Sequence, residues 1–295
     1  MNRMKKRICG CLLALAVGSV SAQDLGVGFK AGLNFNTFRG PTEQSSSDQS
    51  SERFDLNTGF HVGATLTYEA TDLMGARVEL LFTQKGGRRS YEGPSYYRLL
   101  EADRSSSWVS GMRKMDVSVN HSYLDIPLAG YFRPVPFLEV YAGGSVGVLL
   151  SATGFGELRF GGSAQTFPPL PEFSHELDAN FLSDVPGEVR LTDPPATISY
   201  QGKTYVIPQA AGAYFEFGDD PGKLYRRLDA GVLGGLSVFL NGSLYVSGRM
   251  YYGLLDVTRT QADVSLRALD TDGNLVRRED DDRLMSLQCS IGFSF

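Results

Sequence analysis

The last eleven residues alternate strictly between apolar and small or polar side chains, and this pattern constrains the fold more than any other feature of the chain. The apolar positions are Met285, Leu287, Cys289, Ile291, Phe293 and Phe295. Successive side chains of a β-strand point to opposite faces, so a period of two predicts a strand with one apolar face. About nine to eleven tilted residues carry a strand across a bilayer. Residues 285–295 therefore have the length and pattern of a membrane-crossing strand.

The same alternation recurs in seven further segments. They are residues 25–35, 60–69, 76–83, 123–132, 138–150, 228–238 and 244–252. No apolar stretch reaches the length that a membrane-spanning helix needs, and only a closed barrel pairs every backbone group of strands in lipid. A soluble barrel or sandwich shares the alternation, but the second face here is rich in glycine and charge, which suits a narrow barrel interior. We predict an all-β fold, an eight-stranded antiparallel up-and-down transmembrane β-barrel with long extracellular loops.

The predicted connections alternate strictly between short and long. The short ones are 70–74, 133–137 and 239–243, and the long ones are 37–56, 86–120, 151–227 and 256–282. Outer-membrane barrels have short periplasmic turns and long extracellular loops. Both termini are then expected to face the periplasm.

Some of the long connections carry structure signals of their own. Residues 197–207 and 264–278 read as hairpins around Gln201-Gly202 and around residues 270–273. The second hairpin suggests that the last two strands project beyond the membrane. The proline-rich segment 167–195 is not expected to hold one conformation.

Residues 1–22 have the features of a cleaved secretory signal. Four basic residues precede a short apolar run, and Val20-Ser21-Ala22 supplies small residues before Gln23. The predicted mature chain, 23–295, forms the barrel domain. Removing four basic and no acidic residues changes the formal net charge from −5 to −9, which argues against nucleic acid as a partner. Cys289 is then the one remaining cysteine, so no intramolecular disulfide can form.

Charged residues occupy positions on the inward face of the predicted strands. They are Lys30, Glu69, Arg77, Glu79, Asp125, Glu139, Asp229 and Arg249. A buried charge must be paired, because an isolated one is costly. We interpret the eight as a structural network of ion pairs that fills a narrow barrel. The functional alternative is a path for protons or small ions.

Motifs for catalysis or for a cofactor are weak. Three histidines are present, without a nucleophile elbow or a zinc-binding spacing. His121 with Ser122 is kept as a candidate for lipid modification near the outer rim. Residues 270–274 resemble a calcium loop only superficially, because the glycine is misplaced and the closing glutamate is missing. Residues 279–282 read as a solvated acidic loop flank, with bridging to a divalent cation or lipopolysaccharide as the alternative. No catalytic residue, metal or cofactor is predicted.

Five motifs in shared order resemble the PorT-like outer-membrane β-barrels of the Bacteroidetes and their relatives. They are GFKAGLNFNTF (28–38), YLDIPL (123–128), YAGGSVGVLLSA (141–152), DAGVLGGLSV (229–238) and RMYYGLLDV (249–257). The resemblance implies an eight-stranded barrel of OmpA-like architecture in a family whose namesake assists secretion across the outer membrane. Phe295 also resembles the terminal aromatic by which the assembly machinery recognises the closing strand of such barrels.

The sequence therefore predicts an integral outer-membrane protein of a Gram-negative bacterium. Its structural, binding or assembly role is expected to reside in the extracellular loops, without catalysis. The alternative function is a narrow channel for small solutes or ions. The predicted partners are outer-membrane lipid and lipopolysaccharide, the barrel assembly machinery, and a protein bound through the loops.

Overall fold

A computed structural model describes residues 25–44, 50–101, 105–162 and 168–295. The predicted signal, 1–22, and the predicted mature start at Gln23 lie outside the described residues. Within these ranges, the structure contains no helix with the length and apolar character that a membrane crossing requires.

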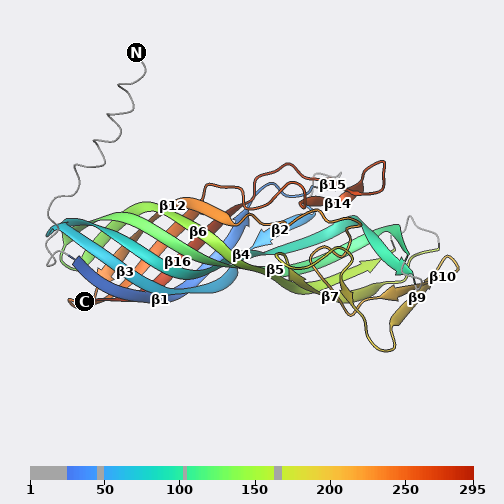
Figure 1. Cartoon of the computed structure of the whole chain (residues 1–295), viewed down its shortest axis with the longest axis horizontal. Helices are drawn as coiled ribbons and strands as arrows, with labels where there is room; N and C mark the ends of the chain where they lie inside the picture. Colours follow the sequence, from blue (N-terminus) through green and yellow to red (C-terminus); the bar gives the residue numbers. More distant parts are fainter. Residues whose placement is uncertain (1–24, 45–49, 102–104, 163–167) are drawn as a thin grey trace, which may run out of the picture.

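Eight antiparallel strands close into a ring (Figure 1). In ring order they are β1 (Leu25–Arg39), β3 (Asn57–Thr71), β4 (Met74–Glu101), β5 (Ser106–Val135), β6 (Leu138–Gly161), β12 (Leu228–Phe239), β13 (Leu244–Gly253) and β16 (Arg283–Ser294). The last strand pairs with the first, so that Gly28 lies opposite Ser294 and Phe35 opposite Leu287. The predicted eight-stranded barrel is confirmed. Both ends of the described chain lie at one end of the ring.

The two faces of each ring strand differ sharply in burial. On β6, Val146 is 57% exposed and points outward, whereas the adjacent Ser145 is 7% exposed and points inward. The same contrast surrounds the ring. Other exposed outward side chains include Phe29, Leu33, Val62, Leu80, Ile126, Val232 and Ile291. A continuous exposed apolar belt of this kind requires an apolar surrounding medium.

Tyrosine rings fill part of the interior by lying over glycines of the neighbouring strand. Gly75 faces Tyr131, and a Cβ added to this glycine would collide with the tyrosine ring. Gly292 faces Tyr245 in the same way. Because glycine has no side chain, the facing ring can lie flat against the barrel wall and occupy the lumen.

Three ring strands continue far beyond the ring at the end opposite the termini. Residues 86–100 of β4 pair with residues 106–120 of β5, and β5 from Met112 onward pairs with β6 as far as Gly161. The prediction of a loop over 86–120 is therefore wrong. Outside a membrane no continuous apolar face is needed, so these strands lack the regular alternation of the ring.

Shorter strands enlarge this extension, which we call the distal sheet. It comprises the projecting parts of β4, β5 and β6 together with six short strands paired to them directly or through one another. These are β2 (Glu52–Asp55), β7 (Phe173–Asn180), β8 (Val189–Arg190), β10 (Lys203–Ile207), β11 (Ala210–Ala211) and β9 (Ala196–Tyr200), which pairs with β10 at the edge. β7 lies within the proline-rich segment and pairs with β6, contrary to the expectation of no single conformation.

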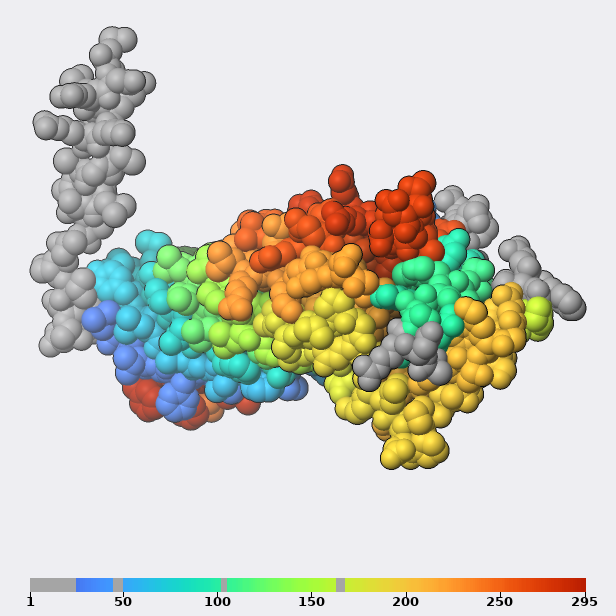
Figure 2. Space-filling model, turned by 45° about the vertical axis from the view of Figure 1, so that its right-hand side comes forward, coloured from blue at the N-terminus to red at the C-terminus, as the bar shows by residue number. Residues whose placement is uncertain are grey.

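Both predicted hairpins are present. β9 and β10 are joined by Gln201 and Gly202, which have positive φ values of 49° and 77°. β14 (Val264–Leu269) and β15 (Leu275–Arg277) form a separate two-stranded sheet. The prediction that the last two ring strands project through this hairpin is therefore wrong. Figure 2 shows the loop between β13 and β16, in orange to red, covering one side of the molecule.

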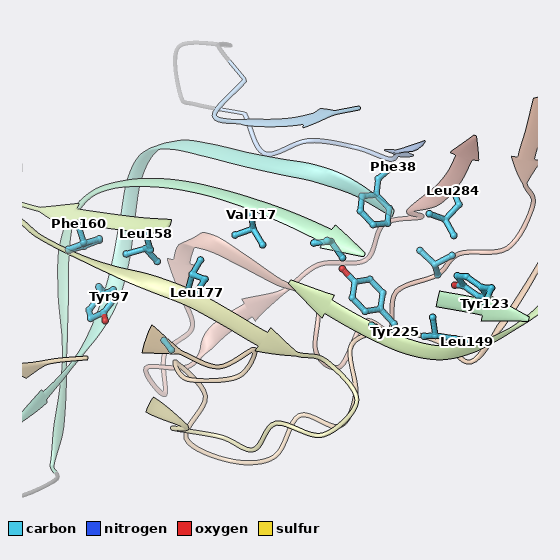
Figure 3. Close-up of a cluster of buried hydrophobic side chains, with 14 of the residues drawn as sticks. Phe38, Tyr97, Val117, Tyr123, Leu149, Leu158, Phe160, Leu177, Tyr225 and Leu284 are labelled. Atoms are coloured by element: carbon cyan, nitrogen blue, oxygen red, sulfur yellow. The ribbon is translucent and has the colours of Figure 1, made fainter. Parts of the chain in front are cut away.

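A continuous hydrophobic core joins the ring to the distal sheet (Figure 3). Phe38 and Leu284 belong to it at the rim of the ring, and Tyr97, Leu158 and Phe160 belong to it in the distal sheet. Tyr225 connects the two parts, since its ring contacts both His121 and Phe181. The cluster therefore extends from the ring interior, where it includes Tyr131, Tyr141 and Leu233, into the distal sheet.

Candidate functional site

The barrel interior holds three groups of paired charges, and β4 contributes to each of them. Along this strand Arg77, Glu79 and Lys85 follow one another from the end that carries the termini towards the distal sheet. All three side chains are buried. The inward face of one strand therefore places charge at successive depths of the ring.

The group nearest the termini is built around Glu139, which is fully buried. Arg77 donates to its carboxylate at 3.0 Å and Arg133 at 3.1 Å. Arg133 also binds Glu69 at 2.7 Å, at the open mouth of the ring. The guanidinium carbon of Arg77 lies 5.6 Å from the centre of the Tyr131 ring. A lone carboxylate at this depth would be costly, and two guanidinium groups offset that cost.

The middle group is built around Glu79. Lys30 Nζ lies 2.9 Å from one carboxylate oxygen and Arg249 Nη1 lies 2.7 Å from the other. Arg249 Nε donates to the side-chain oxygen of Gln288 at 2.8 Å. These residues come from β4, β1, β13 and β16, so the group ties strands from opposite sides of the ring together.

The third group is built around Lys85, close to the distal sheet. Its Nζ lies 3.1 Å from Asp125 and 3.0 Å from Asp229. The Tyr251 hydroxyl donates to Asp229 at 2.8 Å, and Lys85 Nζ lies 4.2 Å from the centre of the same tyrosine ring. Aromatic rings and carboxylates therefore surround this ammonium group.

All eight predicted inward residues lie in these groups, although Glu69 is half exposed at the mouth. Sequence reasoning missed Lys85 and Arg133. The charge balance of the predicted interior is the signal that could have found them. Five predicted acids face only three predicted bases, which indicates that further basic side chains lie inside the ring. The predicted third strand ends at Thr83, before Lys85, and Arg133 lies in a predicted turn.

The structure does not bring the lipid-modification candidates together. His121 and Ser122 are neighbours on β5, so their side chains point to opposite faces. The His121 ring is fully buried, and its centre lies 4.1 Å from that of the Tyr225 ring. His61 instead lies in the barrel interior, where its ring nitrogens contact Asn34 at 2.6 Å and Ser290 at 2.8 Å.

The distal sheet has buried polar groups of its own. Arg113 makes two hydrogen bonds to Glu216, and both side chains are buried. The Tyr97 hydroxyl oxygen lies 3.0 Å from His175 Nε2. Burial lowers the pKa of His175 to about 4. Burial also raises the pKa of Asp263 to about 7. Arg113, Glu216 and Asp263 line a mostly apolar cavity of about 130 Å³.

Phe295, the predicted assembly signal, lies at the end of the ring that carries the termini. Its side chain is 71% exposed, and its ring centre lies 5.7 Å from that of Phe29. Its backbone N–H donates to the carbonyl of Val27 at 2.8 Å. The terminal aromatic is therefore held against the first strand while its face stays accessible.

A closed ring with an exposed apolar belt and paired charges inside defines a transmembrane β-barrel. The family comparison agrees with this class. The family model for the outer membrane protein beta-barrel domain matches residues 21–259 of the sequence. The chain belongs to this family.

Solved outer-membrane proteins are similar to the chain at low sequence identity. Ail, the attachment invasion locus protein of Yersinia pestis, is 11% identical with a TM-score of 0.36, covering 92% of this chain and 98% of Ail. OprG of Pseudomonas aeruginosa is 9% identical with a TM-score of 0.34, covering 92% and 96%. Neisserial surface protein A is 10% identical with a TM-score of 0.33, covering 91% and 97%. No curated protein matches the sequence.

Proposed function

We propose that the protein displays the distal sheet on the outside of a Gram-negative cell and binds a partner there, without catalysing a reaction. In this orientation both termini lie in the periplasm and the distal sheet lies outside the outer membrane. The observation that carries the proposal is the contrast between a ring interior crossed by paired charges and a large folded sheet at one end. The ordered structure beyond the ring forms a surface, the distal sheet, and does not enlarge the lumen.

The buried pairs argue against solute passage. An eight-stranded ring has a radius that side chains fill. Lys30, Glu79 and Arg249 connect opposite walls in the middle of the ring, and the groups around Glu139 and Lys85 lie on either side of them. A solute would have to separate desolvated ion pairs at three depths.

Planar-bilayer recordings of the purified protein are therefore expected to show no stable, large conductance. The physical reason is the closed stack of ion pairs, so the result should not depend on the sign of the voltage. Discrete openings that change in size or ion selectivity when Glu79 is replaced by Gln would instead support the narrow-channel alternative. Addition of protein-free micelles serves as the control.

Labelling of intact cells tests the proposed orientation. In a Cys289→Ser background, a cysteine introduced as Val185→Cys should react with a membrane-impermeant maleimide, because Val185 is exposed in the distal part of the chain. The matched variant Asp72→Cys lies in the exposed turn between β3 and β4 at the other end of the ring. It should react only after lysis. The opposite labelling pattern would reverse the orientation and reject external display.

We propose that residues 1–22 are removed as a signal, and that the exposed terminal Phe295 is recognised by the barrel assembly machinery. Within its family, the motifs support membership of the PorT-like group. Lipid and lipopolysaccharide are proposed to contact the apolar belt and its outer rim, and a protein partner is proposed to contact the distal sheet.

A further inference from the structure

We propose that Asp263, Asp280 and Asp282 bind a calcium ion at the junction between the ring and the distal sheet. One oxygen atom from each of the three carboxylates lies within 4.8 Å of those of the other two. Asp263 directly precedes β14, whereas Asp280 and Asp282 lie in the segment between β15 and β16. The site therefore joins the two ends of the β14–β15 hairpin, which lies beside the distal sheet in Figure 1. This inference does not depend on the proposed function.

Backbone hydrogen bonds fix the two segments that carry the carboxylates. The Arg278 N–H donates to the Asp263 carbonyl at 3.0 Å, and the Val257 N–H donates to the Asp282 carbonyl at 2.8 Å. The Asp282 N–H donates to the side chain of Asp256 at 3.2 Å. The three carboxylates are therefore held together by the fold, and their proximity does not arise from freely moving surface side chains.

This cluster is largely buried, unlike the acidic side chains of an ordinary protein surface. Asp263 is 5% exposed and Asp282 is 8% exposed. Asp263 Oδ2 is buried and has no hydrogen-bond partner among the described residues. A buried carboxylate oxygen normally has a donor or a cation beside it, because removing it from water is otherwise costly. This carboxylate, with one unpartnered oxygen, comes from a separate segment and lies close to those of Asp280 and Asp282.

The nearby positive charges do not balance the cluster. Arg89, Arg278 and Asp280 interact electrostatically with both Asp263 and Asp282, and Glu52 interacts with Asp282. Arg89 and Arg278 both bind Glu52, and Arg278 also binds Asp280. When all four are ionised, the carboxylates outnumber the two guanidinium groups by two negative charges. A divalent cation would neutralise them.

The donor set indicates which cation fits. All three candidate ligands are carboxylates, and hard cations such as Ca²⁺ and Mg²⁺ prefer oxygen donors. Zinc and copper sites normally include imidazole or thiolate, which this set lacks. Ca²⁺ accepts irregular geometry and completes its coordination with water, whereas Mg²⁺ demands near-ideal octahedral geometry. The proposed ion would therefore complete its coordination shell with water.

Isothermal titration of CaCl₂ into the full mature chain tests the proposal. The protein should be refolded into detergent and treated with a chelator, so that no lipopolysaccharide contributes phosphate ligands. We expect one Ca²⁺ per chain, weakened about tenfold or more by Asp263→Asn or Asp282→Asn, and weaker binding of Mg²⁺. Asp281→Asn is the matched control, because Asp281 is 66% exposed and pairs with Arg283 at the surface. Its affinity should equal that of the wild type.

Two results would overturn the proposal. One is the absence of saturable Ca²⁺ binding to the wild-type protein, a result that does not depend on the folding of any variant. The other is equal loss of binding in Asp281→Asn and Asp263→Asn, which would indicate general attraction to an acidic loop. As a second readout, Ca²⁺ should slow proteolysis of the loop between β13 and β16 in the wild type. It should have no such effect in Asp263→Asn.

Discussion

Replacing Glu79 with Gln is expected to destabilise the barrel by about 3–5 kcal/mol, the usual cost of removing one partner from a buried ion pair. The substitution keeps the volume of the side chain and removes its charge. Lys30 and Arg249, which lie 2.9 Å and 2.7 Å from the carboxylate, then remain buried without a counter-ion. Guanidinium-induced unfolding in detergent micelles, followed by circular dichroism, measures the change.

A matched control and a rescue variant make this prediction specific. Glu92 lies on the same strand and pairs with Lys114 at 3.4 Å, but both side chains are about two-thirds exposed or more. Glu92→Gln should therefore leave the unfolding midpoint unchanged. Adding Lys30→Met to Glu79→Gln should recover part of the lost stability, since one unpaired charge is removed. Equal effects at Glu79 and Glu92 would show that the interior pairs contribute no more than surface pairs.

The ring could be predicted from the sequence because lipid imposes a strict pattern on it. Each crossing strand must present apolar side chains outward, so the alternation in segments such as 138–150 reports directly on the fold. The distal parts of β4 and β5 lie beyond the ring, so they do not need an outward apolar face. They contain Gly93 and Pro94 among polar residues, which resemble loop sequence, yet Pro94 lies opposite Met112 within a continuous ladder. Pairing with neighbouring strands and burial of Tyr97 and Leu99 hold this region together instead.

The interior charges were predictable in kind but not in their pairing. Alternation assigns Glu139 to the inward face, yet it cannot say that Arg77 and Arg133 reach the same carboxylate from separate strands. Those contacts depend on side-chain length and on the register between neighbours. The aspartates of the proposed calcium site are still harder to relate from the sequence, because Asp263 and Asp282 are separated by the whole β14–β15 hairpin and meet only in the folded chain.

Replacing Arg113 with Met is expected to destabilise the distal sheet by about 3–5 kcal/mol, because it leaves Glu216 buried without its counter-ion. Arg113 is 2% exposed, makes two hydrogen bonds to Glu216 and donates to the carbonyl of Tyr96 at 2.6 Å. The one tryptophan of the chain, Trp108, lies on the same strand within the distal sheet. Its fluorescence should therefore report unfolding of this sheet at a lower denaturant concentration.

The ring should be insensitive to the same substitution. Its eight strands close on one another without the distal sheet, and its charged groups do not include Arg113. Circular dichroism should accordingly show a second transition at the wild-type midpoint after the tryptophan signal has changed. Arg159→Met is the control, because Arg159 pairs with Glu157 on the exposed face of β6 and should leave both signals unaltered. A single transition shifted equally for both probes would instead mean that the continuous core through Tyr225 couples the ring and the distal sheet into one cooperative unit.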